Sequence, residues 1–171
     1  MLIELKKLVT EQKELDNKIF KKTKSSYKKN QNQRRLWLLV EIGNLANHTK
    51  EFKFWKSAQV KDKIAILDAF AKVLHLTLSF LIQYEEEKKE DEVKYTYDLK
   101  PQKQQPSSLI ISKRFLELYG LAKEMEDRWA CETFTDKLIT LFSLMQLEYK
   151  DLIKAYYKVH ALILKRVEED I

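Results

Sequence analysis

The chain has 171 residues, the length of one domain, and its 44% hydrophobic share is enough to fill a sizeable core. It contains only two glycines, Gly43 and Gly120, and two prolines, Pro101 and Pro106. So few turn residues argue against a sheet protein with many hairpins, and they exclude a glycine-rich phosphate-binding loop. The formal net charge of +6 favours solubility and weak attraction to anions over dedicated nucleic-acid recognition.

The number of cysteines and the first residues of the chain indicate the cellular compartment of the protein. Cys131 is the single cysteine, so it forms no internal disulfide, and with three histidines it leaves no structural zinc set. The first residues carry lysines where a secretory signal would be apolar, and the most apolar segment, 70–84, is interrupted by polar residues. We therefore expect a soluble cytoplasmic protein with no membrane partner.

Apolar residues recur at helical spacing along most of the chain. The stripes in chain order are Leu2, Leu5, Leu8, Leu15 and Ile19; Leu38, Ile42 and Leu45; Leu67, Phe70, Leu74, Leu78 and Leu81; Ile111, Phe115, Leu118 and Ala122; Phe134, Leu138, Leu141 and Met145; and Leu152, Tyr156, Val159, Ile163 and Val167. The pattern predicts an all-α fold, a bundle of about six helices.

Two polar stretches separate these stripes, at about 21–35 and 85–108. We interpret both as connections inside one domain that spans residues 1–171. The first stretch carries seven basic residues and no acid. Its charge would attract nucleic-acid phosphates. Its many lysines and asparagines and its single aromatic residue instead favour a solvated loop, so we do not expect a nucleic-acid partner.

Several segments of the sequence together resemble a known family. The first helix reads L-V-T-E-Q-K-E-L-D-N-K-I, the second L-L-V-E-I-G-N-L-A-N, and E-F-K-F-W-K follows it. The third contains A-F-A-K-V-L-H-L-T-L-S-F, and the last reads K-A-Y-Y-K-V-H-A-L-I-L-K-R. In this order they resemble the dimeric all-α dUTPase family of the all-α NTP pyrophosphatase superfamily, which implies a homodimer that hydrolyses a pyrimidine nucleotide.

The resemblance also implies a magnesium site on the second and third helices. Carboxylates at positions i and i+3 lie on one helix face, and two such pairs on facing helices form a four-carboxylate site suited to Mg²⁺ and substrate phosphates. In this chain the four positions hold Glu41, Asn44, Ala69 and Lys72. Only Glu41 keeps a carboxylate.

The replacement of three carboxylates, one of them by a lysine, changes the charge enough to oppose magnesium binding. A magnesium ion about 6 Å from Lys72 would be repelled by roughly 5 kcal/mol at an effective dielectric constant of about 20. We therefore expect hydrolysis to be lost or very weak, with no cofactor required; magnesium enters only if activity persists, with Glu41 as its remaining ligand. An alternative keeps an active enzyme with replacement acids such as Asp68 or Asp62, and another places Glu41 in an ion pair with Lys72.

The family's positions near the base and sugar are better retained. The resemblance places Gln12, Asp16, Lys53 and Trp55 near a pyrimidine base and sugar, because an amide matches the uracil edge and an aromatic ring stacks on it. On the phosphate side it keeps Lys158 and Arg166 as candidates. The family's second lysine and two asparagines are replaced there by Val159, His160 and Ile163. The alternative is that Gln12 joins two helices, that Trp55 packs in the core and that the two cations are solvated.

Three functions follow from these observations. The first is a nucleotide-binding relative of the dUTPases that no longer cleaves its ligand, and the second is an active dUTP or dUDP hydrolase with replacement metal ligands. The third is a helical scaffold or interaction protein, with the basic stretch contacting nucleic acid. His75 we interpret as a hydrogen-bonded core residue. A set of aromatic residues is expected to pack the C-terminal helices, with part of it forming a homodimer face: Trp129, Phe134, Phe142, Tyr149, Tyr156 and Tyr157.

Overall fold

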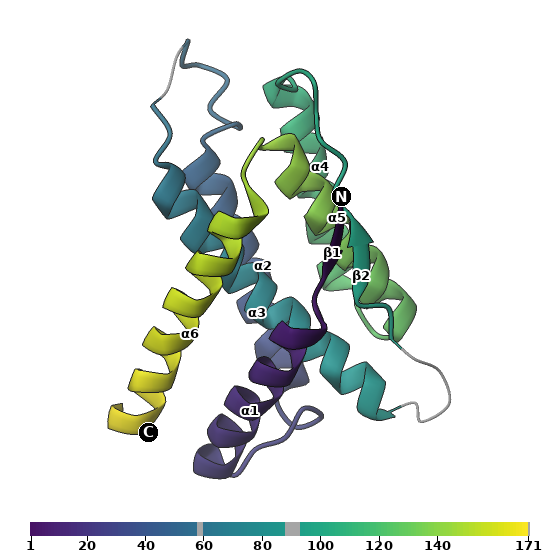
Figure 1. Ribbon diagram of the computed structural model, residues 1–171, viewed down its shortest axis with the longest axis vertical. Coiled ribbons are helices and arrows are strands. Elements are labelled where there is room, and N and C mark those ends of the chain that lie inside the picture. The colour runs from purple at the N-terminus through teal and green to yellow at the C-terminus, as the bar shows by residue number, and fades with distance from the viewer. Residues whose placement is uncertain (58–59, 88–92, 171) are drawn as a thin grey trace.

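The computed structural model describes residues 1–57, 60–87 and 93–170. It contains six helices, which confirms the all-α prediction, and one two-stranded sheet. In chain order the elements are β1 (Leu2–Glu4), α1 (Lys6–Thr23), α2 (Gln31–Thr49), α3 (Lys63–Glu87), β2 (Thr96–Asp98), α4 (Ser108–Lys123), α5 (Arg128–Leu144) and α6 (Tyr149–Asp170). Figure 1 shows α4, α5 and the sheet on one side of the molecule, with α6 on the opposite side.

The central element is α3, which packs against α1, α2, α5 and α6. Its sequence is apolar on nearly every face, so it is buried along almost its whole length. By length and composition alone α3 would also be able to cross a membrane, but most of it is buried inside this bundle, as expected of a core helix. The helices around it supply amphipathic faces.

The small sheet was not predicted. Leu2 was assigned to the first helical stripe, but residues 2–4 form β1, which pairs antiparallel with β2 from the second polar stretch. Ile3 lies opposite Tyr97, and both side chains are fully buried. A three-residue strand whose partner lies more than 90 positions away leaves no periodic signal, so the sequence pattern did not reveal it.

The helices extend into the stretches predicted as connections, so the connections are shorter than expected. α1 continues to Thr23 and α2 begins at Gln31, so only residues 24–30 join them inside the predicted stretch 21–35. The chain turns at Lys24, whose backbone has a left-handed φ of 52°. Ser107 caps α4, because its side chain accepts a hydrogen bond from the Ile110 amide.

The burial of α2 gives a stability prediction. Leu38 is fully buried, whereas Leu36 on the same helix is 64% exposed. Leu38→Ala is expected to lower the free energy of unfolding by about 3 kcal/mol, because it removes buried methyl groups and leaves a cavity. Leu36→Ala is the matched control and should change it by less than about 0.5 kcal/mol. Urea unfolding of both variants measures the difference, and equal losses would contradict the described packing.

Candidate functional site

A cavity of about 360 Å³ lies between α1, α2, α3 and α6, and we name it the central cavity. Two of the predicted nucleotide-binding residues, Gln12 and Asp16, line it from α1. The other lining residues are Leu15, Ile19, Phe20, Asn30, Gln33, Arg34, Trp37, His75, Leu76, Ser79 and Ile163. The lining therefore combines six apolar side chains with seven polar or charged ones. Apolar surface with a polar group at one part of the wall is typical of small-molecule sites.

Asp16 and Gln12 form the centre of that polar group. Gln12 Nε2 donates to Asp16 Oδ1 over 2.8 Å, and the hydroxyl of Tyr27 donates to Asp16 Oδ2 over 3.0 Å. Burial raises the pKa of Asp16, while hydrogen bonds from Ser79, Gln12 and Tyr27 oppose the rise. Burial and the neighbouring Asp16 also raise the pKa of Tyr27, which keeps the phenol protonated as a donor.

Arg34 is a buried guanidinium on α2 beside these groups. Its Nε donates to Asn30 over 2.7 Å, Nη1 donates to Ser79 over 3.2 Å, and Nη2 donates to the Tyr27 carbonyl over 2.8 Å and to Gln83. The guanidinium also lies over the rings of Tyr27 and Phe80. Arg34 therefore joins α2 to α3 and to the α1–α2 connection at the wall of the cavity.

His75 on α3 closes the polar group on the side of α6. Its Nδ1 lies 2.5 Å from Gln12 Oε1, and its ring stacks on Tyr156 with centroids 4.0 Å apart. Because Gln12 Oε1 is an acceptor, this contact requires a proton on His75 Nδ1. Burial lowers the pKa of His75 to about 3, so the ring is neutral at physiological pH. These contacts confirm that His75 is a hydrogen-bonded core residue.

The lowered pKa of His75 predicts a pH-dependent stability. In the unfolded chain His75 binds a proton below pH 6.5, whereas in the folded protein it does so only near pH 3. Its contribution to stability is therefore complete above pH 6.5 and is lost as the pH falls towards 3, by up to about 1.4 kcal/mol per pH unit. Urea unfolding across this pH range should show that the free energy of unfolding changes less with pH in His75→Asn than in the wild-type protein. His48→Asn, on an exposed position, should keep the wild-type slope.

The four positions of the predicted metal site do not form an acidic cluster. Glu41 is buried, and its two oxygens accept hydrogen bonds from Trp37 Nε1 at 2.9 Å and from Asn44 Nδ2 at 3.2 Å. Ala69 is buried and Lys72 is exposed on α3. The predicted ion pair of Glu41 with Lys72 is wrong, because no ion pair between described residues joins them. The indole and amide donors satisfy the carboxylate instead.

This donor set does not fit magnesium. Mg²⁺ requires oxygen ligands, but the four positions present one carboxylate that already accepts two hydrogen bonds, one amide, one methyl group and one ammonium. In the described part of the chain, no group of three histidine, cysteine or acidic side chains is arranged to hold a metal ion. The two proposed substitute acids also have other partners. Asp68 pairs with Lys158 of α6 at 2.5 Å, and Asp62 caps the start of α3.

The remaining predicted nucleotide residues lie outside the lining of the central cavity. Lys53 and Trp55 follow α2, and Trp55 is 62% exposed, so the interpretation of Trp55 as a core residue is wrong. Trp55 packs edge-to-face on Phe54, which is also exposed. Lys158 is exposed and pairs with Asp68. Arg166 is exposed near the end of α6.

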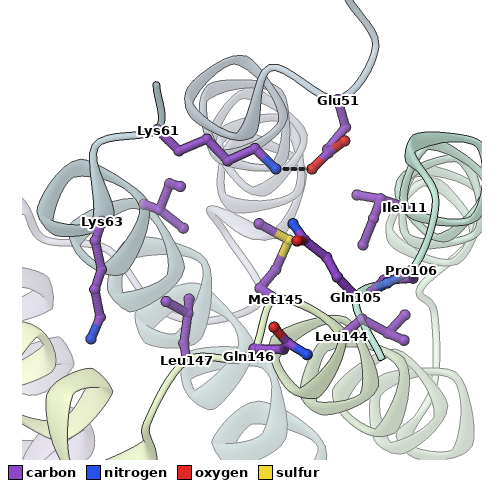
Figure 2. Close-up of a pocket in the computed structure, with 11 residues that line it drawn as sticks. Glu51, Lys61, Lys63, Gln105, Pro106, Ile111, Leu144, Met145, Gln146 and Leu147 are labelled. Carbon is purple, nitrogen blue, oxygen red and sulfur yellow. Dashed lines mark hydrogen bonds and ion pairs between the residues drawn. The ribbon is translucent and has the colours of Figure 1, made fainter. Parts of the chain in front are cut away.

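A second cavity, of about 280 Å³, lies at the start of α3 and α4 and the end of α5. Figure 2 shows Lys61 and Glu51 paired at its edge, with Met145 and Gln105 between them and the α5 end. Glu51 also accepts a hydrogen bond from Ser108. None of the predicted site residues lines this cavity. We therefore place the functional site in the central cavity.

Sequence reasoning missed several residues of the site, among them Tyr27, Arg34, Trp37 and Ser79. Arg34 had been counted only as part of a basic stretch, although an arginine at helical spacing from the apolar residue Leu38 was a usable signal for burial. Phe134, Phe142 and Tyr156 of the aromatic set are buried, as expected of residues that pack the C-terminal helices. Trp129 is 72% exposed, and pairing of two copies stays a prediction.

Comparison with known proteins covers nearly the whole chain. A family model described as dUTPase, of the all-α type, matches residues 4–170. The match includes all six helices and every residue that lines the central cavity. No curated protein and no solved structure matches the chain significantly.

Proposed function

The chain belongs to the all-α dUTPase family, and from that premise we propose that it binds a pyrimidine nucleotide without hydrolysing it at the rate of a metal-dependent enzyme. The base occupies the central cavity. The observation that carries the proposal is the contrast between an intact polar wall in this cavity and a neighbouring position that has lost its acidic ligands.

The cavity has the size and chemistry that a pyrimidine requires. Gln12, Asp16 and Arg34 supply donors and acceptors on one wall. Leu15, Leu76 and Ile163 supply apolar surface for the faces of a planar ring, and burial of that surface favours binding. A base held there is in contact with polar groups that α1 and α2 hold in fixed positions, so little ordering is needed on binding.

Trp37 connects this cavity to the former metal position. Its ring lines the cavity, while its Nε1 donates to Glu41. A nucleotide whose base fills the cavity therefore extends its phosphates past Trp37 towards α2 and α3. Lys72, exposed on α3, is the candidate cation for these phosphates, at one of the positions where the resemblance places a metal ligand. An ammonium attracts phosphate but supplies no activated water.

The experiment that tests binding is a thermal-shift titration with a non-hydrolysable dUTP analogue in EDTA. A ligand that binds only the folded state raises the melting temperature, so the wild-type protein should show a concentration-dependent rise. Ile163→Trp fills the cavity from α6 and should abolish the rise. Leu162→Trp is the matched control. Leu162 precedes Ile163 on α6, but it is 50% exposed and does not line the cavity.

Two outcomes would contradict this proposal. The absence of any shift in the wild-type protein would favour the scaffold function over nucleotide binding. A shift that Ile163→Trp leaves unchanged would place the nucleotide elsewhere on the molecule. The alternative of an active enzyme gains no support from Asp68 or Asp62, because Lys158 and the amides at the start of α3 already contact these acids.

A further inference from the structure

We propose that the second cavity, at the start of α3 and α4 and the end of α5, binds a free apolar α-amino acid such as leucine in its zwitterionic form. The second cavity shares no lining residue with the central cavity, so this site is independent of the proposed nucleotide binding. The inference follows from the apolar wall of the cavity, the ion pair at its edge and the hydrogen-bonding groups left for a ligand there.

The apolar wall of the second cavity comes from several elements. Ile66 of α3 and Ile111 of α4 form part of it, and the chain between α5 and α6 adds Met145 and Leu147. Gln146, between these two, has a left-handed φ of 54°, so the chain turns sharply beside the cavity. The unbranched thioether of Met145 adapts readily to the shape of a neighbouring group. This wall therefore suits an aliphatic group.

The volume of the second cavity limits the size of its ligand. It is about 280 Å³, just below the range of roughly 300–1,000 Å³ that is typical of sites for drug-sized molecules. At about 30 Å³ for each water in the liquid, this space corresponds to about nine water molecules. A single amino acid fits such a space, whereas a peptide of several residues does not.

An ion pair lies at the edge of the apolar wall. Lys61 pairs with one oxygen of Glu51, as Figure 2 shows, and the Ser108 hydroxyl donates to the other oxygen. The Glu51 side chain is 10% exposed and that of Lys61 is 29% exposed, so water screens their charges only in part. Lys63, the other lysine of the lining, pairs with Asp151 at 3.1 Å. The cavity edge therefore presents one carboxylate beside one ammonium.

Both charged groups keep hydrogen-bonding capacity for a ligand. The Lys61 ammonium has three N–H groups, and it donates one of them to Glu51. The Glu51 carboxylate has about four lone-pair sites, of which Lys61 and Ser108 use two. Gln105 also lines the cavity, and its amide has no hydrogen-bond partner among the residues that the structure describes. Donors and acceptors are therefore both available beside the apolar wall.

This pair of charges favours a ligand that carries both signs. A simple carboxylate gains the Lys61 ammonium but lies beside the Glu51 carboxylate, and a simple amine has the opposite problem. An α-amino acid places its ammonium against Glu51 and its carboxylate against Lys61, and its side chain is left for the apolar wall. Charge-assisted hydrogen bonds then form at both ends of the head group. The cavity is therefore complementary to an apolar amino acid rather than to a fatty acid or an alkylamine.

Methyl NMR of the full chain, labelled with ¹³C at the methionine methyl groups, tests binding at this site. The chain has three methionines. Met145 lines the cavity, Met125 precedes the opposite end of α5, and Met1 is 63% exposed at the N-terminus. Addition of L-leucine should shift the Met145 signal until it saturates and should leave the other two signals unchanged. Met145→Leu assigns the signal by removing it.

Three analogues test the chemistry of the ligand without any protein variant. 4-Methylpentanoate lacks the ammonium and L-leucinamide lacks the carboxylate, so each should bind at least about 10-fold more weakly than leucine because one charge-assisted contact is lost. Glycine keeps both charges but lacks the aliphatic side chain, and it should bind about 100-fold more weakly. Affinity for 4-methylpentanoate equal to that for leucine would overturn the assignment of a zwitterion.

A cavity-filling variant tests the location. Leu147→Trp occupies the space beside Met145 and should abolish leucine binding. Ile64→Trp is the matched control, because Ile64 is 67% exposed and does not line the cavity, and it should bind leucine like the wild-type protein. A Met145 signal that leucine leaves unshifted in the wild-type protein, or binding that persists in a folded Leu147→Trp variant, would overturn the proposal.

Discussion

Purified protein incubated with dUTP is expected to release pyrophosphate at the same low rate in Mg²⁺ as in EDTA. The reason is the charge at the family's metal position. Four carboxylates would sum to −4, but Glu41 and Lys72 sum to zero, and Asn44 and Ala69 add no charge. Repulsion from the ammonium alone lowers Mg²⁺ binding on the order of 10³-fold, and the lost carboxylates lower it further.

The control for this assay is a protein with the acids rebuilt. Asn44→Glu, Ala69→Glu and Lys72→Asp in one chain restore carboxylates at all four positions, and this variant should bind Mg²⁺ more tightly than the wild type if it remains folded. Magnesium-dependent turnover by the wild-type protein, removed by Glu41→Gln, would contradict the prediction. Turnover that survives Glu41→Gln would point to a contaminating enzyme.

Arg34→Met is expected to lower the free energy of unfolding by about 3–5 kcal/mol. Arg34 is 6% exposed, and its removal leaves Asn30, Ser79, Gln83 and the Tyr27 carbonyl without their donor. Buried acceptors without partners, and a buried Asp16 without a nearby cation, each cost free energy. Urea unfolding measures the loss.

Arg166→Met is the matched control for that variant. Arg166 is exposed, so the same substitution there should change the free energy of unfolding by less than about 0.5 kcal/mol. A loss at Arg34 no larger than the loss at Arg166 would show that the buried guanidinium does not hold the wall of the cavity together.

The helical bundle could be predicted from the sequence because each helix carries an apolar stripe. The stripe through Leu38, Ile42 and Leu45 predicted α2, and all three residues are buried. The sheet could not be predicted, because Ile3 and Tyr97 belong to strands of three residues whose pairing depends on the three-dimensional arrangement of the chain. Short strands have too few alternating positions to reveal a period.

The candidate site was predicted in part. Gln12 and Asp16 were found from their motif, and the structure brings them together with His75. Trp55 was expected beside them, but the structure leaves it exposed on the α2–α3 connection. Arg34 was missed because a basic residue in a lysine-rich segment is usually solvated, and only the packing of α2 on α3 shows that it is buried.

The most direct test of the central claim is a titration of Mn²⁺, as a magnesium substitute, followed by electron paramagnetic resonance in the presence of the non-hydrolysable dUTP analogue. The amount of Mn²⁺ bound in the ternary mixture should not exceed the amount that the nucleotide binds alone, and Glu41→Gln should leave it unchanged. Additional Mn²⁺ bound by the wild-type protein and lost in Glu41→Gln would contradict the account, because it would show that the position still holds a divalent ion.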